Sequence, residues 1–246
     1  MALLFNGSST YLDCGSSFTV VDNMFTAGGE AVGATVMAWI YPRNWGSDYS
    51  QASIIDKSSS GSPWWSGWHF GLNDFLLTET LVFTFEFDSG HGKWRAPSSS
   101  ISLNTWQHVA VSYNNASTAN DPKLYINGVS VTVTETSTPS GTPYLDQSYN
   151  LVIGGLTSNY FYGDVADLRC YKGILSDHAI QTIYASIGND GIVNNLRIRY
   201  LMKELATGVA ATGAGTIKNL SGYSNNANPV NSPVYSDDII STGRMI

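Results

Sequence analysis

Three of the four histidines and one cysteine are the side chains that could bind a metal ion or act as a catalytic base. They are His69, His91, His108 and Cys170. Zinc sites use His and Cys at short characteristic spacings, and these residues do not show them. A serine nucleophile on a strand-to-helix turn needs a G-x-S-x-G motif, which the sequence lacks. We therefore expect these residues to be structural, and we expect no enzyme.

Two pairs of aromatic residues near polar loops could instead hold a sugar, because aromatic rings stack on sugar faces. Trp64 and Trp65 stand in the Ser- and Gly-rich stretch 58–66, and Tyr160 and Tyr162 precede Gly163. The alternative for these rings is burial against a neighbouring subunit or the C-terminal residues. Exposed apolar groups usually mark a contact site. The four aromatic residues are thus candidate contacts with a glycan or a partner protein.

Composition limits the classes of protein to consider. The chain has 246 residues, a net charge of −7 and only 13% charged residues, against ~25% in an average soluble domain. The acidic balance argues against nucleic-acid binding, which needs clustered Lys and Arg. No stretch is long enough to insert into a membrane. Residues 1–5 carry no features of a signal peptide, so we expect synthesis in a cytoplasm without export.

Residues 104–133 predict a β-hairpin at the centre of the fold. Residues 106–113 alternate between two sides, with Val109, Val111 and Tyr113 on one of them, which is typical of a strand. Asn127-Gly128 separates two further β-rich runs, and this dipeptide favours a tight hairpin turn because both residues tolerate positive φ. The polar stretch 114–121 between the strands is expected to be a loop.

Further strands and one short helix follow from the same patterns. We expect strands around 18–21, 35–41, 53–57, 67–72, 81–87, 165–171 and 196–203. The run 35–41 is apolar on both sides, which indicates burial on both faces. Ser176 is a suitable N-cap for a helix over 177–186. Residues 189–246 change in character and are expected to form a C-terminal strand and arm that packs on the sandwich or on a partner.

Four segments carry a resemblance to a known family. They are LFNGS with YL in residues 4–12, TVMAWIYP in 35–42, W-x-H-V-A-V-S-Y with L-Y-I-N-G-V in 106–129, and GDVADLRCYKGILS in 163–176. In this order they resemble the laminin-G-like, concanavalin-A-like jelly-roll domains of lectins and glucanases. The resemblance implies an all-β jelly-roll sandwich of two antiparallel sheets over residues 1–188, followed by the C-terminal extension. It would bring Cys14 near Cys170, as two buried thiols or, alternatively, as a disulfide.

The resemblance also suggests two kinds of site. Related glucanases use E-x-D-x-E on one strand, and Glu86-Phe87-Asp88 is a fragment of that pattern with glycine at position 90. Because glycoside hydrolysis needs two carboxyl groups, we do not expect it here. The family often holds a structural calcium ion. Asn6 and Asp167 are the matching candidates, while Ala166 stands where the family commonly has Asp.

Two functional hypotheses remain. Laminin-G-like domains without signal peptides resemble those of phage virions. With the sparse charge and the arm, this favours a non-enzymatic virion structural protein, a capsid-decoration or tail-associated protein. Its partners would be the major capsid or tail protein and further copies of itself. The alternative is a carbohydrate-binding module that recognises a glycan on a host surface. Neither hypothesis implies a cofactor, apart from the structural calcium.

Overall fold

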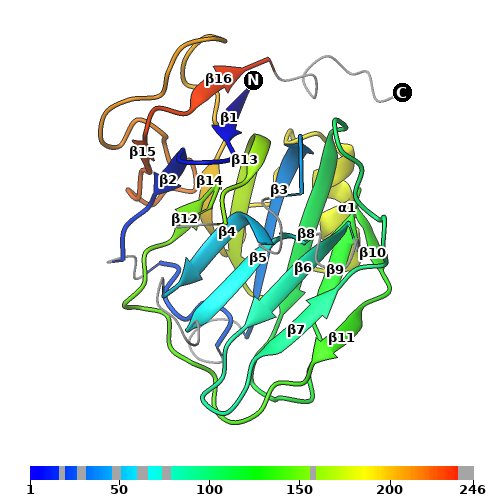
Figure 1. Ribbon diagram of the computed structural model, residues 1–246. Helices are drawn as coiled ribbons and strands as arrows, with labels where there is room; N and C mark the ends of the chain where they lie inside the picture. Colours follow the sequence, from blue (N-terminus) through cyan, green and yellow to red (C-terminus); the bar gives the residue numbers. More distant parts are fainter. Residues whose placement is uncertain are drawn as a thin grey trace.

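The chain folds into two antiparallel β-sheets that pack face to face (Figure 1). The computed structural model describes residues 1–16, 20–26, 32–45, 51–59, 66–73, 79–155 and 159–237. Sheet A has the order β10-β9-β8-β3-β13-β1-β16, and β14 also pairs with β13. Sheet B has the order β11-β7-β6-β5-β4-β12-β2-β15. The predicted all-β sandwich is therefore confirmed.

The strands of each sheet are as follows. Sheet A contains β1 (Ala2–Asn6), β3 (Ala34–Pro42), β8 (Gln107–Tyr113), β9 (Lys123–Ile126), β10 (Val129–Val131), β13 (Tyr162–Lys172), β14 (Leu196–Tyr200) and β16 (Val234–Ser236). Sheet B contains β2 (Tyr11–Asp13), β4 (Gln51–Ser58), β5 (Gly67–Asn73), β6 (Thr80–Phe85), β7 (Gly92–Arg95), β11 (Thr134–Ser137), β12 (Val152–Ile153) and β15 (Asn228–Val230).

The core lies between the sheets and is built by the period-two alternation of their strands. Its largest side chains include Trp68, Phe83 and Trp94 from sheet B and Tyr113 from sheet A. The predicted inward set of residues 81–87, with Phe85 and Phe87, is confirmed. This apolar layer holds the outward side chains of sheet B in fixed positions.

The central hairpin forms as predicted. β8, β9 and β10 are joined in an antiparallel ladder, and the turn residues Asn127 and Gly128 have φ values of 50° and 76°. Positive φ at both positions is the reason for the Asn-Gly sequence. The Asn127 carboxamide oxygen also accepts a hydrogen bond from the His108 backbone at 3.0 Å, which joins the turn to β8.

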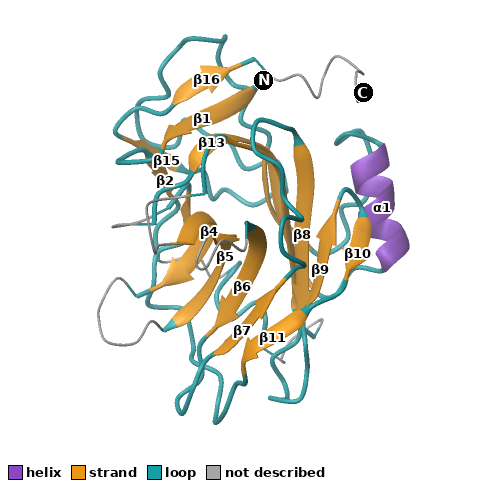
Figure 2. Cartoon of the chain, turned by 45° about the vertical axis from the view of Figure 1, so that its right-hand side comes forward, coloured by secondary structure: helices purple, strands orange, loops and turns teal. Residues whose placement is uncertain are grey.

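The outer face of sheet A is covered by the helix α1 (Asp177–Ala185), which lies beside β8, β9 and β10 in Figure 2. Ser176 caps it by accepting a hydrogen bond from the Ala179 N–H. Ile180 and Ile183 pack on Met37 of β3, so β3 is buried on both faces as predicted. None of the helices in the described part of the chain is long and apolar enough to cross a membrane.

The strand expected around residues 18–21 is wrong where the structure describes it. Residues 20–25 form turns, and residues 17–19 lie outside the described part of the chain. Asn23 has a φ of 50°, and its backbone N–H bonds to the Asp146 carboxylate at 2.6 Å. Asp146 returns a bond from its own N–H to the Asn23 side chain at 2.8 Å. This side-chain exchange replaces the ladder that a strand would need.

The C-terminal segment adds two strands to sheet A and one strand to sheet B. β16 pairs with β1 in sheet A, and β15 pairs with β2 in sheet B. β14 pairs with the second half of β13, and β1 pairs with the first half of the same strand. In Figure 1 the orange and red C-terminal strands therefore lie beside the blue N-terminal ones. The segment packs on its own sandwich.

Cys14 and Cys170 are both buried and free. Burial raises the pKa of Cys14 to about 12, and it also raises the pKa of Cys170, with the neighbouring Cys14 acting in the same direction. The two cysteines are therefore close to each other and protonated. The expectation of two buried thiols is confirmed.

Candidate functional site

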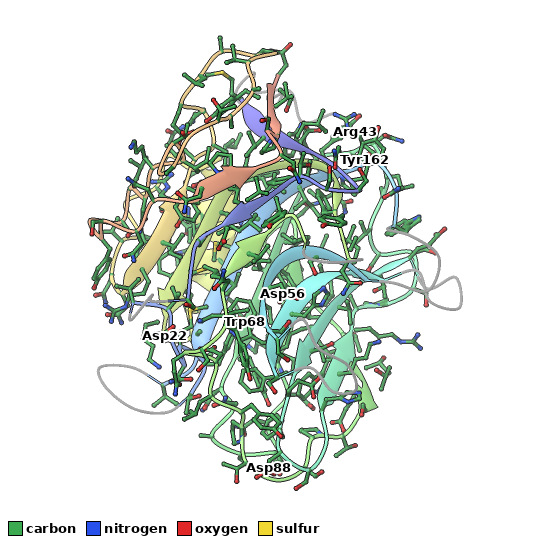
Figure 3. The ribbon with its side chains drawn as sticks, turned by 60° about the vertical axis from the view of Figure 1, so that its left-hand side comes forward. Asp22, Arg43, Asp56, Trp68, Asp88 and Tyr162 are labelled. Atoms are coloured by element: carbon green, nitrogen blue, oxygen red, sulfur yellow. The ribbon has the colours of Figure 1, made fainter. Side chains whose placement is uncertain are left out.

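A row of four polar side chains crosses the outer face of sheet B. It consists of Asp56 on β4, His69 on β5, Thr84 on β6 and Lys93 on β7, and we call it the polar row. Each member is paired directly with the next across the sheet. Directly opposite residues of antiparallel strands place their Cβ atoms ~4.5–5.5 Å apart on the same face. Figure 3 labels Asp56, which marks the β4 end of the row.

The middle of the polar row is buried but holds unused hydrogen-bonding atoms. His69 is 2% exposed, and neither of its ring nitrogens has a hydrogen-bond partner among the described residues. The same holds for the Thr84 Oγ1 atom, whereas a hydrogen bond from the Ser53 hydroxyl lowers the pKa of the neighbouring Asp56 carboxyl group. Ser53 lies opposite Gly71, two residues from His69. A buried polar atom without a partner costs ~1–3 kcal/mol, so these atoms are suited to a ligand with several hydroxyl groups.

His69 and the neighbouring Asp56 have pKa values that are shifted in opposite directions. Burial lowers the pKa of His69 to about 3, and the charge of Lys93 acts in the same direction. Neutral imidazole offers one donor and one acceptor. Burial raises the pKa of Asp56 to about 6, and hydrogen bonds from Ser58 oppose that shift. At neutral pH the row therefore presents a neutral histidine beside a buried carboxylate.

Gly71 provides the room that the His69 ring occupies. A Cβ atom at position 71 would lie 2.8 Å from the His69 Cε1 atom and 2.9 Å from Nε2. It would also lie 2.2 Å from the Ala52 carbonyl oxygen. Contacts this short do not occur in folded proteins, because interiors are close-packed without overlap. The glycine therefore lets the imidazole lie across the strand next to Ser53.

The glucanase-like fragment Glu86–Asp88 has two different environments. Glu86 lies just after β6, is 9% exposed, and has a pKa raised to about 7 by burial. Asp88 is exposed and accepts hydrogen bonds from the Ser89 hydroxyl and the Thr142 backbone, which lower its pKa. The Asp88 carboxylate thus stabilises the local turn. Besides Glu86, the carboxyl group on the outer face whose pKa is raised is that of Asp56.

Of the four predicted aromatic contacts, the structure describes only Tyr160 and Tyr162. Trp64 and Trp65 lie outside the described residues. Tyr160 is half-buried and packs on Tyr11 of sheet B, with ring centroids 6.4 Å apart. Tyr162 is 37% exposed on β13 of sheet A, where its carbonyl oxygen accepts a hydrogen bond from the Arg43 N–H. Figure 3 shows Tyr162 beside Arg43, at the end of the molecule opposite Asp88.

Asn6 and Asp167 cannot share a calcium ion. Asn6 lies opposite Tyr162 on β13, five residues from Asp167, which is ~17 Å along a strand. The Asn6 Oδ1 atom accepts hydrogen bonds from the N–H groups of residues 8, 9 and 10. The Asp167 carboxylate binds Arg169 at 2.7 Å and Arg199 at 2.8 Å. Both side chains are therefore already used within the fold, and the structural calcium stays a prediction.

A group of oxygen atoms that could attract a metal ion surrounds the ammonium of Lys57 instead. Lys57 is fully buried on the inward side of β4, and its ammonium donates to the carbonyl oxygens of Asp146 and Tyr149 at 2.9 and 2.8 Å. It pairs with the Asp22 carboxylate at 3.0 Å, and Asp146 also accepts a bond from the Trp68 indole at 2.9 Å. Figure 3 labels Asp22 and Trp68. Among the described residues, no group of three or more His, Cys, Asp or Glu is placed to hold a metal ion.

Most of the polar row could not be recognised from the sequence. His69 was expected to be structural, and Asp56, Thr84, Lys93 and Ser53 were not singled out. The available signal is a polar residue at an outward position in each of four consecutive strands. Alternation shows that such residues point away from the core, but it does not show which of them stand opposite one another.

A protein-family model described as the Concanavalin A-like lectin/glucanases superfamily matches residues 12–181, which include every strand of the polar row. The chain belongs to this superfamily. The resemblance seen in the sequence is thereby confirmed, together with the jelly-roll sandwich. No curated protein matches the sequence significantly.

Solved structures of lectin-like sandwiches are similar to this superfamily member. A proposed carbohydrate binding protein from Bacteroides ovatus has a TM-score of 0.62 at 16% identity, and the match covers 96% of this chain and 61% of that protein. The binding domain of botulinum neurotoxin serotype G has a TM-score of 0.47 at 15% identity, with coverage of 68% and 38%. The CBM40 of the Ruminococcus gnavus IT-sialidase has a TM-score of 0.45 at 12% identity, with coverage of 62% and 83%. At such identities the first likeness shows a shared fold, and the other two carry no argument.

Proposed function

We propose that this chain binds a carbohydrate on the outer face of sheet B. The observation that carries the proposal is the set of buried, unpartnered polar atoms on two adjacent strands, namely both His69 ring nitrogens and Thr84 Oγ1. Sugar hydroxyl groups both donate and accept hydrogen bonds, so one oligosaccharide can satisfy several of these atoms at once. Membership of a superfamily of lectins and glucanases supports this choice of ligand.

The geometry assigns a part to each side chain. Neutral His69 donates from one ring nitrogen and accepts at the other, while the Thr84 and Ser53 hydroxyl groups bind on either side of it. Asp56 accepts from a sugar hydroxyl at the β4 end of the row. These positions are held by the aromatic layer beneath, so little side-chain freedom is lost on binding. Because the His69 and Thr84 atoms are buried in the free protein, binding requires the groups that cover them to move.

The virion hypothesis stays a prediction. It was motivated partly by an arm suited to lie on a partner, and the C-terminal strands pair within their own chain instead. None of the similar structures reported above is a virion protein. The predicted contacts with a capsid or tail protein and with further copies of the chain have no observation in their favour, so we prefer the carbohydrate alternative.

The test is a glycan-array screen of the whole protein, followed by calorimetry on the best ligand. His69→Phe keeps a ring over Gly71 but removes both nitrogens, so we expect binding to fall about tenfold, since each hydrogen bond contributes ~0.5–1.5 kcal/mol. The matched control is His108→Phe. His108 is equally buried but lies on sheet A against Trp39, so its loss should leave affinity unchanged. Absence of binding to any glycan would refute the proposal.

Hydrolysis is the competing activity, because Asp56 and Glu86 are two carboxyl groups on one face. They stand on strands β4 and β6, which are two strand spacings or ~10 Å apart, and they are also offset along the sheet. Retaining glycosidases need ~5–5.5 Å and inverting enzymes ~6.5–9.5 Å between the two groups. We therefore expect binding without release of reducing sugar, which a standard reducing-end assay on the bound glycan measures.

A further inference from the structure

Two cations lie side by side at the β7 end of the polar row. Lys93 stands opposite Thr84, and Arg95 stands opposite Val82. Residues at alternate positions of one strand point to the same face, so both side chains share the outer face with His69. Both are half-buried. They are therefore part of the wall of the candidate site.

Neither cation has an ion pair or a side-chain hydrogen bond among the described residues, although the protein carries a net charge of −7. Most other cations of the described chain are neutralised by carboxylates: Arg43 by Asp164, Lys57 by Asp22, Lys123 by Asp177, Arg169 by Asp167 and Asp190, and Arg199 by Asp167. Lys203, which also has no ion pair or side-chain hydrogen bond among the described residues, is exposed to solvent. Lys93 and Arg95 differ because they are half-buried and adjacent.

The charge of this pair acts on its surroundings. Burial and the neighbouring Arg95 lower the pKa of Lys93, and Lys93 in turn contributes to the lowered pKa values of His69 and His91. Asp56, the carboxylate of the row, lies three strand spacings away, or ~14 Å. Two like charges held together and half-removed from water are unfavourable until an anion lies between them.

We propose that the saccharide bound by the polar row is acidic, and that a sugar carboxylate lies between Lys93 and Arg95 while neighbouring hydroxyl groups bind Thr84 and His69. This inference rests on the proposed carbohydrate function and names the class of its ligand. An arginine fork binds a carboxylate through two parallel hydrogen bonds, and a lysine adds a point charge. A saccharide with hexuronic acid units has carboxylates and hydroxyl groups at the required spacing of a few ångströms.

The experiment uses the whole protein and pairs of polysaccharides that differ only in their acid groups. Polygalacturonate, alginate and hyaluronan are each compared with their carboxyl-reduced forms, and a sulfated neutral glucan is the second anionic probe. At low salt we expect at least one acidic form to bind ten times or more tightly than its reduced form, with the advantage falling as salt rises. The sulfated glucan should bind more weakly than the best uronate.

Variants then locate the contact. Lys93→Gln and Arg95→Gln should each weaken binding of the acidic form about tenfold and leave the reduced form unaffected. Lys203→Gln, an exposed cation away from sheet B, should change neither. Equal binding of acidic and reduced forms, equal binding of the sulfated glucan, or full affinity in both variants would overturn the inference while leaving the carbohydrate function in place. Failure of the unaltered protein to bind any saccharide, acidic or neutral, would overturn both.

Discussion

Replacing Lys57 by methionine tests whether its ammonium holds one end of the sandwich together. Methionine keeps an unbranched side chain of similar length but removes the charge, two hydrogen bonds to carbonyl oxygens and the pairing with Asp22. It leaves the carboxylates of Asp22 and Asp146 without their cation. Removing one partner of a buried ion pair costs ~3–5 kcal/mol. For a chain of this size that corresponds to a fall in Tm of roughly 6–20 °C.

The measurement is thermal and urea unfolding at pH 7, with Lys123→Met as the matched control. Lys123 pairs with Asp177 at 3.0 Å, but both side chains are more than half exposed, and exposed pairs contribute only ~0–1 kcal/mol. The control should therefore lose little stability. A free energy of unfolding of Lys57→Met within 1 kcal/mol of that of the unaltered protein would refute the reasoning. It would mean that the contacts of the ammonium in the fold are no more favourable than its hydration in the unfolded chain.

A change of pH provides a second check on the same variant. Burial raises the pKa of Asp146 even with Lys57 beside it. Without the ammonium this carboxyl group takes up a proton more readily, which removes the unpaired charge. The difference in the free energy of unfolding between variant and parent should therefore shrink as pH falls from 7 toward 4. A difference that grows on acidification would contradict the assignment.

Four further changes have defined outcomes. Asp56→Asn should stabilise the fold at pH 8 by up to about 3 kcal/mol, because a folded-state pKa raised from 3.8 to about 6 penalises the anion; the gain should vanish at pH 3, where the carboxyl group is protonated in both states. The pKa of His69 is lowered from 6.5 to about 3, so between these values the residue is neutral in the folded state but protonated in the unfolded state. Acidification from pH 7 to 4 should therefore lower the free energy of unfolding of the parent by about 3 kcal/mol more than that of His69→Phe. Gly71→Ala should destabilise by 2 kcal/mol or more through its overlap with the Ala52 carbonyl oxygen. Ser176→Ala should cost about 1 kcal/mol by removing the cap of α1. Urea unfolding at the stated pH values measures all four.

Local patterns in the sequence were sufficient for most of the fold. The alternation in residues 81–87 predicts which side chains face the core, and Asn127-Gly128 predicts the turn, because both signals arise within one strand or one loop. The failure at residues 20–21 has the opposite origin. The Asn23 backbone N–H donates to the carboxylate of Asp146, 123 residues away, and the Asn23 side chain accepts from the Asp146 N–H. No local pattern contains that contact.

The candidate site was largely out of reach for the same reason. His69 could be placed on the outward side of its strand, but its neighbours Asp56 and Thr84 come from other strands and depend on register. Register is set by the packing of the whole sandwich rather than by any one segment. The distance between the calcium candidates Asn6 and Asp167 depends on register in the same way, because it follows from the pairing of β1 with β13.

The position of β1 has a consequence for the order in which the molecule can be made. Leu3 pairs with Val165 and with Tyr235, partners that are synthesised 162 and 232 residues later. At ~5–20 residues per second, a ribosome needs about 8–30 s to reach the first of them. During that time the apolar segment Ala2–Phe5 has no strand to pair with. The segment Ala2–Phe5 is thus placed only after much of the sandwich has been synthesised, and a chaperone that shields it until then should raise the yield of folded protein.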